Sequence, residues 1–179
     1  MRKINTVLSA LLLCIFLIHG VMGSFMLLGV ASSAGKILAW IGVMILIAHT
    51  VIGVLLTGKT LRKGNENSEH YLKQNAVFWA RRASGLAILI LFFFHIGLFG
   101  RLQGGIYILF PFTTLKLITQ LLLTAALFVH LFINVRPLLV SLGILKYKER
   151  RGDIYLILSV LLLFFAGATI IYYIGWQQI

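Results

Sequence analysis

Five long apolar segments make up most of this chain, and they leave few folds open to it. A helix needs about 20 mostly apolar residues to cross a membrane. Inside a bilayer, only helices and closed barrels satisfy all of their own backbone polar groups. The segments run over roughly residues 4–30, 35–57, 77–100, 112–135 and 153–175. We therefore predict an all-α integral membrane protein with five transmembrane helices.

Little of the chain remains outside these segments. Of its 179 residues, 60% are hydrophobic and only 11% are charged, whereas soluble domains carry about 25% charged residues. No connection is long enough to fold alone, because domains rarely fall below about 50 residues. We expect residues 1–179 to form one transmembrane domain, so any flavin or iron–sulfur domain must belong to another subunit. The single cysteine, Cys14, excludes an intrachain disulfide and a cysteine-ligated cluster.

Basic residues concentrate on one side of the predicted membrane. The net charge of +12 could indicate nucleic acid or anionic lipid as a partner. However, all of the 16 Lys and Arg residues except Lys36, Arg101 and Lys116 fall on the side of the N-terminus. The positive-inside rule then predicts a cytoplasmic N-terminus, an outside C-terminus and no nucleic-acid partner. We expect a multi-pass protein of the bacterial cytoplasmic membrane, with the first segment retained as a helix because it is longer than a signal sequence.

Four of the five histidines lie inside apolar segments, one in each of the first four. An ionisable group within a membrane is costly and is by default a functional candidate. His19 and His95 fall toward the outside, whereas His49 and His130 fall toward the inside. At 1.5 Å per residue, the two levels are roughly 15 Å apart. The fifth histidine, His70, lies among charges, and we expect it to be a solvated loop residue.

This arrangement predicts two stacked haem sites, each with two axial histidines. Helices of a bundle project side chains into a shared core, where cofactor sites are built. His19 and His95 would bind the iron of an outer b-type haem, and His49 and His130 that of an inner one. The predicted fold is a four-helix bundle around two b haems, with diagonal ligand pairs and a peripheral fifth helix. The alternative for each histidine is a hydrogen bond within the membrane core.

Two arginines and four small or polar residues have two interpretations each. Arg81 and Arg82 open the third segment at the inner level, where they could bind haem propionates or act as positive-inside anchors. Asn134, four residues after His130, could hydrogen-bond near the inner site or between helices. The remaining positions could make room for a flat macrocycle or let helices pack closely; they are Gly23, Gly42 and Gly53.

The same residues resemble a known family. Four stretches carry the resemblance. They are Leu46–Lys59 (L-I-A-H-T-V-I-G-V-L-L-T-G-K), the set Arg82, Ser84 and Gly85 followed by His95, H-x-x-x-N with S-L-G-I in the fourth segment, and I-F-L-I-H at 15–19. The chain is similar, over nearly its whole length, to the cytochrome b membrane-anchor subunit of the succinate dehydrogenase and fumarate reductase family. Within that family it resembles the five-helix, two-haem type.

The resemblance implies a role in respiratory electron transport. Such an anchor passes electrons between a membrane quinone and an iron–sulfur subunit, which docks with a flavoprotein on the cytoplasmic face. We expect two haem b groups, a quinone (menaquinone in our expectation) and membrane lipid as ligands. The chain would be an enzyme subunit without the dehydrogenase activity itself, and Ser84 would join the cofactor-binding residues. The basic connections around 59–73 and 146–151 would form the docking surface or only set topology.

The quinone site is the part that the sequence predicts least. Some two-haem relatives place an acid near the outer surface, but all four acids here fall inside, namely Glu66, Glu69, Glu149 and Asp153. An inner site, or an outer one with protons from solvent, both remain open. The polar groups available outside are Ser32, Ser33, Gln103 and Tyr107.

Two other functions stay open at this stage. One is a haem b subunit of a hydrogenase or formate dehydrogenase, or a transmembrane ferric or ascorbate reductase. Those families usually place two ligands on one helix. The other is a haem-free transporter or assembly factor, whose histidines would relay protons or form hydrogen bonds; no membrane-embedded acid is present to partner them.

Overall fold

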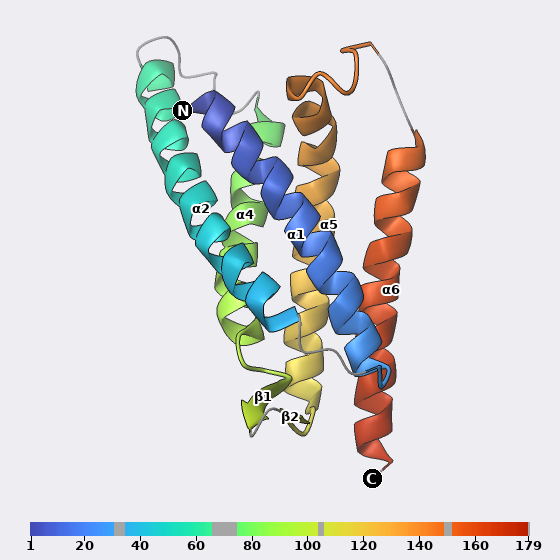
Figure 1. Cartoon of the computed structure of the whole chain (residues 1–179). Helices are drawn as coiled ribbons and strands as arrows, with labels where there is room; N and C mark the ends of the chain where they lie inside the picture. Colours follow the sequence, from blue (N-terminus) through green and yellow to red (C-terminus); the bar gives the residue numbers. More distant parts are fainter. Residues whose placement is uncertain (31–34, 66–74, 104–105, 149–151, 179) are drawn as a thin grey trace.

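The computed structural model describes residues 1–30, 35–65, 75–103, 106–148 and 152–178. Within these ranges, five long helices stand side by side and the two termini lie at opposite ends (Figure 1). The helices are α1 (Arg2–Leu27), α2 (Gly35–Asn65), α4 (Ala76–His95), α5 (Thr114–Ser141) and α6 (Gly152–Gln177). Each is long and apolar enough to cross a membrane. The predicted all-α, multi-pass architecture is therefore confirmed.

A small hairpin joins α4 to α5. Strands β1 (Gly100–Gln103) and β2 (Ile106–Leu109) pair antiparallel, with Gly100 opposite Leu109. Helix α4 ends at His95, earlier than the hydropathy pattern predicts, because Ile96 is extended and Gly97 has φ of +68°. Glycine has no Cβ, so it adopts this left-handed conformation without strain. The early stop leaves His95 as the last residue of its helix.

Helix α5 instead continues past its predicted end at residue 135, through Pro137 to Ser141. A proline inside a helix has no N–H to donate to the carbonyl four residues earlier. That carbonyl belongs to Ile133, and here it accepts a hydrogen bond of 3.4 Å from Nη2 of Arg81 on α4. A side chain from a neighbouring helix thus replaces the missing backbone donor, as is common at prolines in membrane helices.

The closest helix pairs are α1 with α2, α4 with α5, and α6 with both α1 and α5. The fifth helix, α6, therefore packs against both α1 and α5. Gly20 permits the close approach of α1 to α6, since a Cβ at this position would lie 2.6 Å from the ring of Phe165. Phe16 completes the contact edge-on, with its ring centre 5.9 Å from that of Phe165.

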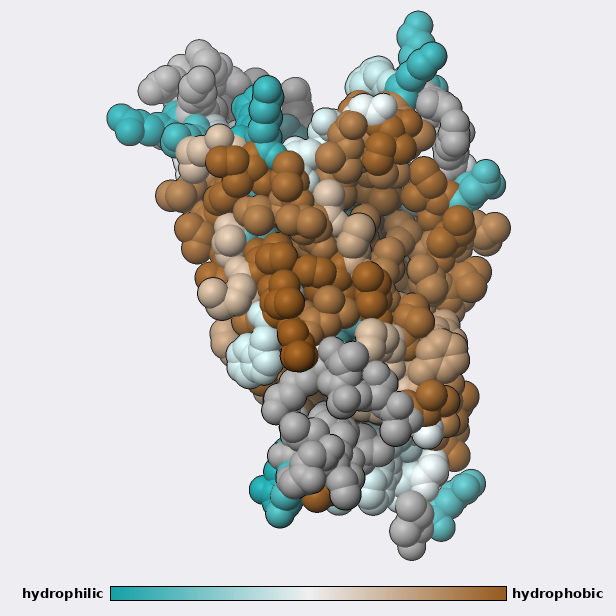
Figure 2. Space-filling view, viewed as in Figure 1, coloured by the Kyte–Doolittle hydropathy of each residue, from teal (hydrophilic) through white to brown (hydrophobic). Residues whose placement is uncertain are grey.

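The outer surface is strongly apolar around the middle of the bundle. Figure 2 shows a wide hydrophobic belt, with hydrophilic side chains at the two ends. Large apolar side chains are exposed on the helices, among them Met44, Phe93, Leu115 and Leu163, each about 70% exposed. Exposed apolar patches of this extent are rare on soluble proteins. In a membrane the same surface faces lipid tails.

Candidate functional site

The four segment histidines come together in two pairs, and the pair toward the hairpin end is His19 and His95. His19 projects from α1 and His95 from the end of α4, and their ring centres are 6.1 Å apart with planes at 79°. Two imidazoles that bind one iron from opposite sides through bonds of about 2 Å would have centres about 6 Å apart. The separation of this pair is of that size.

The two histidines of this outer pair differ in their surroundings. His95 Nδ1 lies 2.7 Å from Oε1 of Gln120, a side chain of α5 that is only 4% exposed. His19 Nδ1 is buried and has no hydrogen-bond partner among the described residues. Buried polar atoms normally have a partner, so His19 is an exception in this site.

The other pair, His49 and His130, lies toward the opposite end. His49 on α2 contacts Ser9 of α1, with 3.3 Å between Nδ1 and Oγ. His130 on α5 contacts Ser84 of α4, with 3.0 Å between Nδ1 and Oγ. Each of these two rings is thus contacted by a serine of a neighbouring helix. Gly85 lies beside His130, since a Cβ there would be 3.5 Å from Cε1 of its ring.

The serine hydroxyls can orient these inner rings. Ser9 Oγ donates to the carbonyl of Asn5 at 2.8 Å, and Ser84 Oγ donates to that of Arg81 at 3.2 Å. When its proton points to that carbonyl, each hydroxyl oxygen can accept a hydrogen bond from Nδ1–H of the histidine. The amide oxygen Oε1 of Gln120 is likewise an acceptor toward His95. Metal-binding histidines usually donate one ring N–H in this way, which directs the other nitrogen, here Nε2, to the metal.

The distance between the two levels is about the same along three of the helices. On α1, Ser9 at the inner level precedes His19 by ten residues, and on α5 Gln120 at the outer level precedes His130 by ten. On α4, Ser84 precedes His95 by eleven. At 1.5 Å per residue each spacing is about 15 Å. The two pairs therefore lie at two depths, as the positions of the histidines in their segments predict.

Arg81 and Arg82 lie at the inner level with defined roles in the bundle. Arg81 bonds to the Ile133 carbonyl through Nη2, and its buried Nε has no partner. Arg82 donates to the carbonyl of Phe78 at 2.9 Å, and its guanidinium carbon lies 3.2 Å from the centre of that ring. Asn134 does not reach another helix, since its Nδ2 donates to the carbonyl of His130 in its own helix at 2.7 Å.

The glycines divide between the two interpretations. A Cβ on Gly42 would lie 3.1 Å from Cγ2 of Ile15, so Gly42 serves the close packing of α2 against α1. A Cβ on Gly23 or on Gly53 would meet no atom within 4 Å. Helix packing in the described structure therefore does not require those two glycines.

The groups considered for quinone chemistry are dispersed. Gln103 is exposed on β1, and Asp153 is exposed in the first turn of α6. Outside the described residues and side chains lie Ser32, Ser33, Glu66, Glu69, His70, Tyr107 and Glu149. The structure therefore groups no predicted quinone residues with a histidine pair in the part that it describes.

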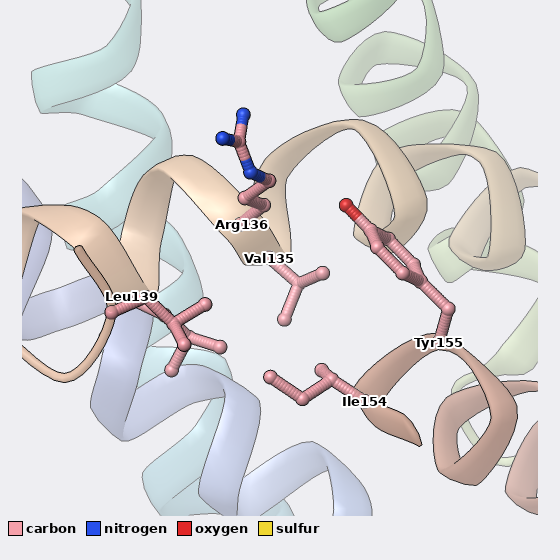
Figure 3. A pocket seen from close by; sticks show the side chains of 6 residues that line it. Val135, Arg136, Leu139, Ile154 and Tyr155 are labelled. Carbon is pink, nitrogen blue, oxygen red and sulfur yellow. The ribbon is translucent and has the colours of Figure 1, made fainter. Parts of the chain in front are cut away.

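Two pockets occur near the ends of the bundle, and neither is lined by histidine. Figure 3 shows the first, a small hollow between α5 and α6 where Val135 and Leu139 face Ile154 and Tyr155. The second opens between the ends of α1 and α6 and is lined by Leu27, Leu28, Gly29, Ile171, Tyr172, Gly175 and Trp176. Both linings are mainly apolar, so the histidine pairs remain the candidate site.

The donor set suits a haem better than a bare metal ion. Among the described residues, no three His, Cys, Asp or Glu side chains gather to bind a metal. A haem iron needs fewer protein ligands, because the macrocycle supplies four nitrogens and the protein only the axial positions. Comparisons with protein-family models, with curated proteins and with solved structures find no match for this chain.

Proposed function

We propose that this chain is the di-haem cytochrome b membrane anchor of a succinate:quinone oxidoreductase or a quinol:fumarate reductase. The observation that carries the proposal is the arrangement of its histidines. Two pairs from four helices lie about 15 Å apart in depth, and three of the four rings have an oxygen acceptor at Nδ1. This leaves Nε2 of those rings to bind iron, in the manner of metal-bound imidazoles.

In this proposal each side chain has a defined task. His19 and His95 hold the outer haem, and His49 and His130 hold the inner one. When bound, each haem supplies one-electron redox chemistry. The chain itself orients the imidazoles through Ser9, Ser84 and Gln120. Its apolar helices would also surround the haems, and burial of this kind is one of the factors that set a haem potential.

The arginines would serve the inner haem. Arg81 and Arg82 lie within one turn of Ser84 on α4, next to the inner pair. Guanidinium groups bind carboxylates with paired hydrogen bonds, so one of them would hold a propionate. The buried Nε of Arg81 has no partner among the described residues, which supports Arg81 for this role.

The resemblance supports the remaining parts of the proposal. Electrons would pass between menaquinone in a bacterial cytoplasmic membrane and an iron–sulfur subunit with its flavoprotein on the cytoplasmic side. The chain is almost entirely membrane-spanning, so the dehydrogenase chemistry would belong to those partners. The basic ends of the helices on the N-terminal side would provide their docking surface.

The deciding experiment is a count of haem in the purified protein. The chain would be coexpressed with its native neighbours, purified in detergent and assayed as the pyridine haemochrome, with protein measured by amino-acid analysis. We expect about two b haems per chain and copurification of a flavoprotein. A haem-free preparation would contradict the proposal and favour a transporter or assembly factor. Two haems without a flavoprotein would instead favour a different membrane oxidoreductase.

A further inference from the structure

Gln120 stands out among the polar residues within the membrane. Its side chain is almost fully buried on α5 among apolar neighbours. Burying an amide is costly unless it is hydrogen-bonded. Its best contact is the 2.7 Å bond between its Oε1 and Nδ1 of His95, whereas its Nε2 reaches only Thr119 Oγ1 at 3.5 Å. The placement of this amide is therefore best explained by His95.

The bond from Gln120 is the shortest of the three contacts between a side chain and a histidine ring among the described residues. The serine contacts of the inner pair are longer, at 3.0 Å for Ser84 and 3.3 Å for Ser9. In the outer pair, His19 Nδ1 has no partner among the described residues. In that part of the chain, Gln120 is therefore the side chain that hydrogen-bonds to a ring of this pair.

We propose that Gln120 is a positioning residue that lowers the reduction potential of the outer haem through His95. The inference rests on the proposed di-haem function. An acceptor at Nδ1–H makes an imidazole a stronger electron donor at Nε2 and fixes its orientation. A more basic axial ligand stabilises ferric iron relative to ferrous iron, so the potential falls. Hydrogen bonding of this kind is one of the few means by which a protein tunes its haem.

The test is a redox titration of the coexpressed, detergent-purified complex, followed by visible absorption. Gln120→Leu removes the acceptor and keeps an apolar side chain of similar size. We expect two haems to remain and the potential of the outer one alone to rise. Outer-shell substitutions commonly change metal-site properties by about tenfold or more, and a tenfold shift in the ferric–ferrous equilibrium is about 59 mV for one electron. The outer haem is identified as the one missing from His19→Ala.

Two further variants make the result specific. Gln120→Glu keeps an oxygen acceptor at the same reach, so its outer potential should not rise above that of the unmodified protein. Thr124→Val is the matched control, because Thr124 lies one turn along α5 and its hydroxyl bonds only to the Gln120 carbonyl in that helix. It should leave both potentials unchanged. Low-spin ferric electron paramagnetic resonance of the outer haem should change in Gln120→Leu and not in Thr124→Val, because ring orientation affects that signal.

The outcomes separate this inference from the proposed function. Two haems with unchanged potentials in Gln120→Leu would overturn the role of Gln120 and leave the di-haem proposal intact. If Gln120→Leu loses the outer haem, Gln120→Glu decides: an outer potential at or below the original supports the role, and a raised one overturns it. A haem-free unmodified complex would overturn both.

Discussion

The side of the bundle that carries α6 and the side that carries α2 are held together differently. Where α6 packs on α1 and α5, large apolar side chains are buried, among them Leu158, Leu162 and Phe165. On α2, no residue with a described side chain is buried. Instead, a side-chain hydrogen bond between His49 and Ser9 joins α2 to α1.

The difference shows two ways to hold helices together in lipid. Burial from water is not available as a driving force there, so association depends on close packing and on interhelical hydrogen bonds. The α6 side uses packing, with Gly20 admitting the ring of Phe165. The histidine-bearing helices also use hydrogen bonds, three of which join a histidine ring to a side chain of a neighbouring helix. A fourth joins Arg81 to the Ile133 carbonyl. If the histidines only join helices, replacing them should loosen the bundle, whereas if they bind haem, each pair should control one cofactor.

The largest expected effect is the loss of one haem. His19→Ala or His95→Ala should remove the outer haem and keep the inner one, and His49→Ala or His130→Ala should do the reverse. Each variant should fall from about two haems per chain to about one in the pyridine haemochrome assay. His70→Ala, at a position outside the described residues, is the control and should keep both. Full haem in all four variants would show that the histidines serve only the packing of the helices.

The next largest effect is a loss of stability where α6 packs on α1. Gly20→Ala would place a methyl group 2.6 Å from the Phe165 ring, and overpacking of this kind costs about 1–3 kcal/mol. The measurement is the thermal midpoint in detergent. Gly23→Ala is the matched control, since a Cβ there meets nothing within 4 Å. Adding Phe165→Leu to Gly20→Ala should recover stability, and equal effects of the two alanines would contradict this account of the contact.

A comparable effect is expected where α4 meets α5. Arg81→Met would leave the Ile133 carbonyl without its donor, and an unsatisfied buried group costs about 1–3 kcal/mol. Pro137→Ala restores a backbone N–H for that carbonyl, so the cost of Arg81→Met should shrink in that background. A denaturation double-mutant cycle measures this coupling. A change in the inner haem potential that Pro137→Ala does not rescue would indicate a separate propionate contact.

The smallest expected effect is a change in the inner haem potential when Ser84 or Ser9 is replaced. Ser84→Ala and Ser9→Ala each remove one acceptor from an inner histidine, and a single hydrogen bond contributes about 1 kcal/mol. The inner haem potential should rise in both, and more in Ser84→Ala because its contact is 3.0 Å against 3.3 Å. Redox titration measures both variants. A shift of the outer potential instead would mean that the pairs are assigned to the wrong levels.

Much of the site follows from depth along the helices. Gln120 and Ser9 did not emerge from the sequence as site residues, yet the same reasoning could have found them. Gln120 is ten residues before His130, which puts it at the level of His95, and Ser9 is ten before His19, at the level of His49. What depth cannot show is the direction in which a side chain points around the helix axis.

The sequence by itself determined five apolar helices and the two depths of the histidines, because hydropathy and a rise of 1.5 Å per residue act along one dimension. Tertiary structure alone decided the rotation of each helix and its neighbours. It brought Gln120 to His95, and it supplied Arg81 to the carbonyl that Pro137 leaves without a donor, so that α5 continues to Ser141. Such contacts depend on how helices turn and pack against one another, and no local pattern in one helix encodes the side chain that its neighbour presents.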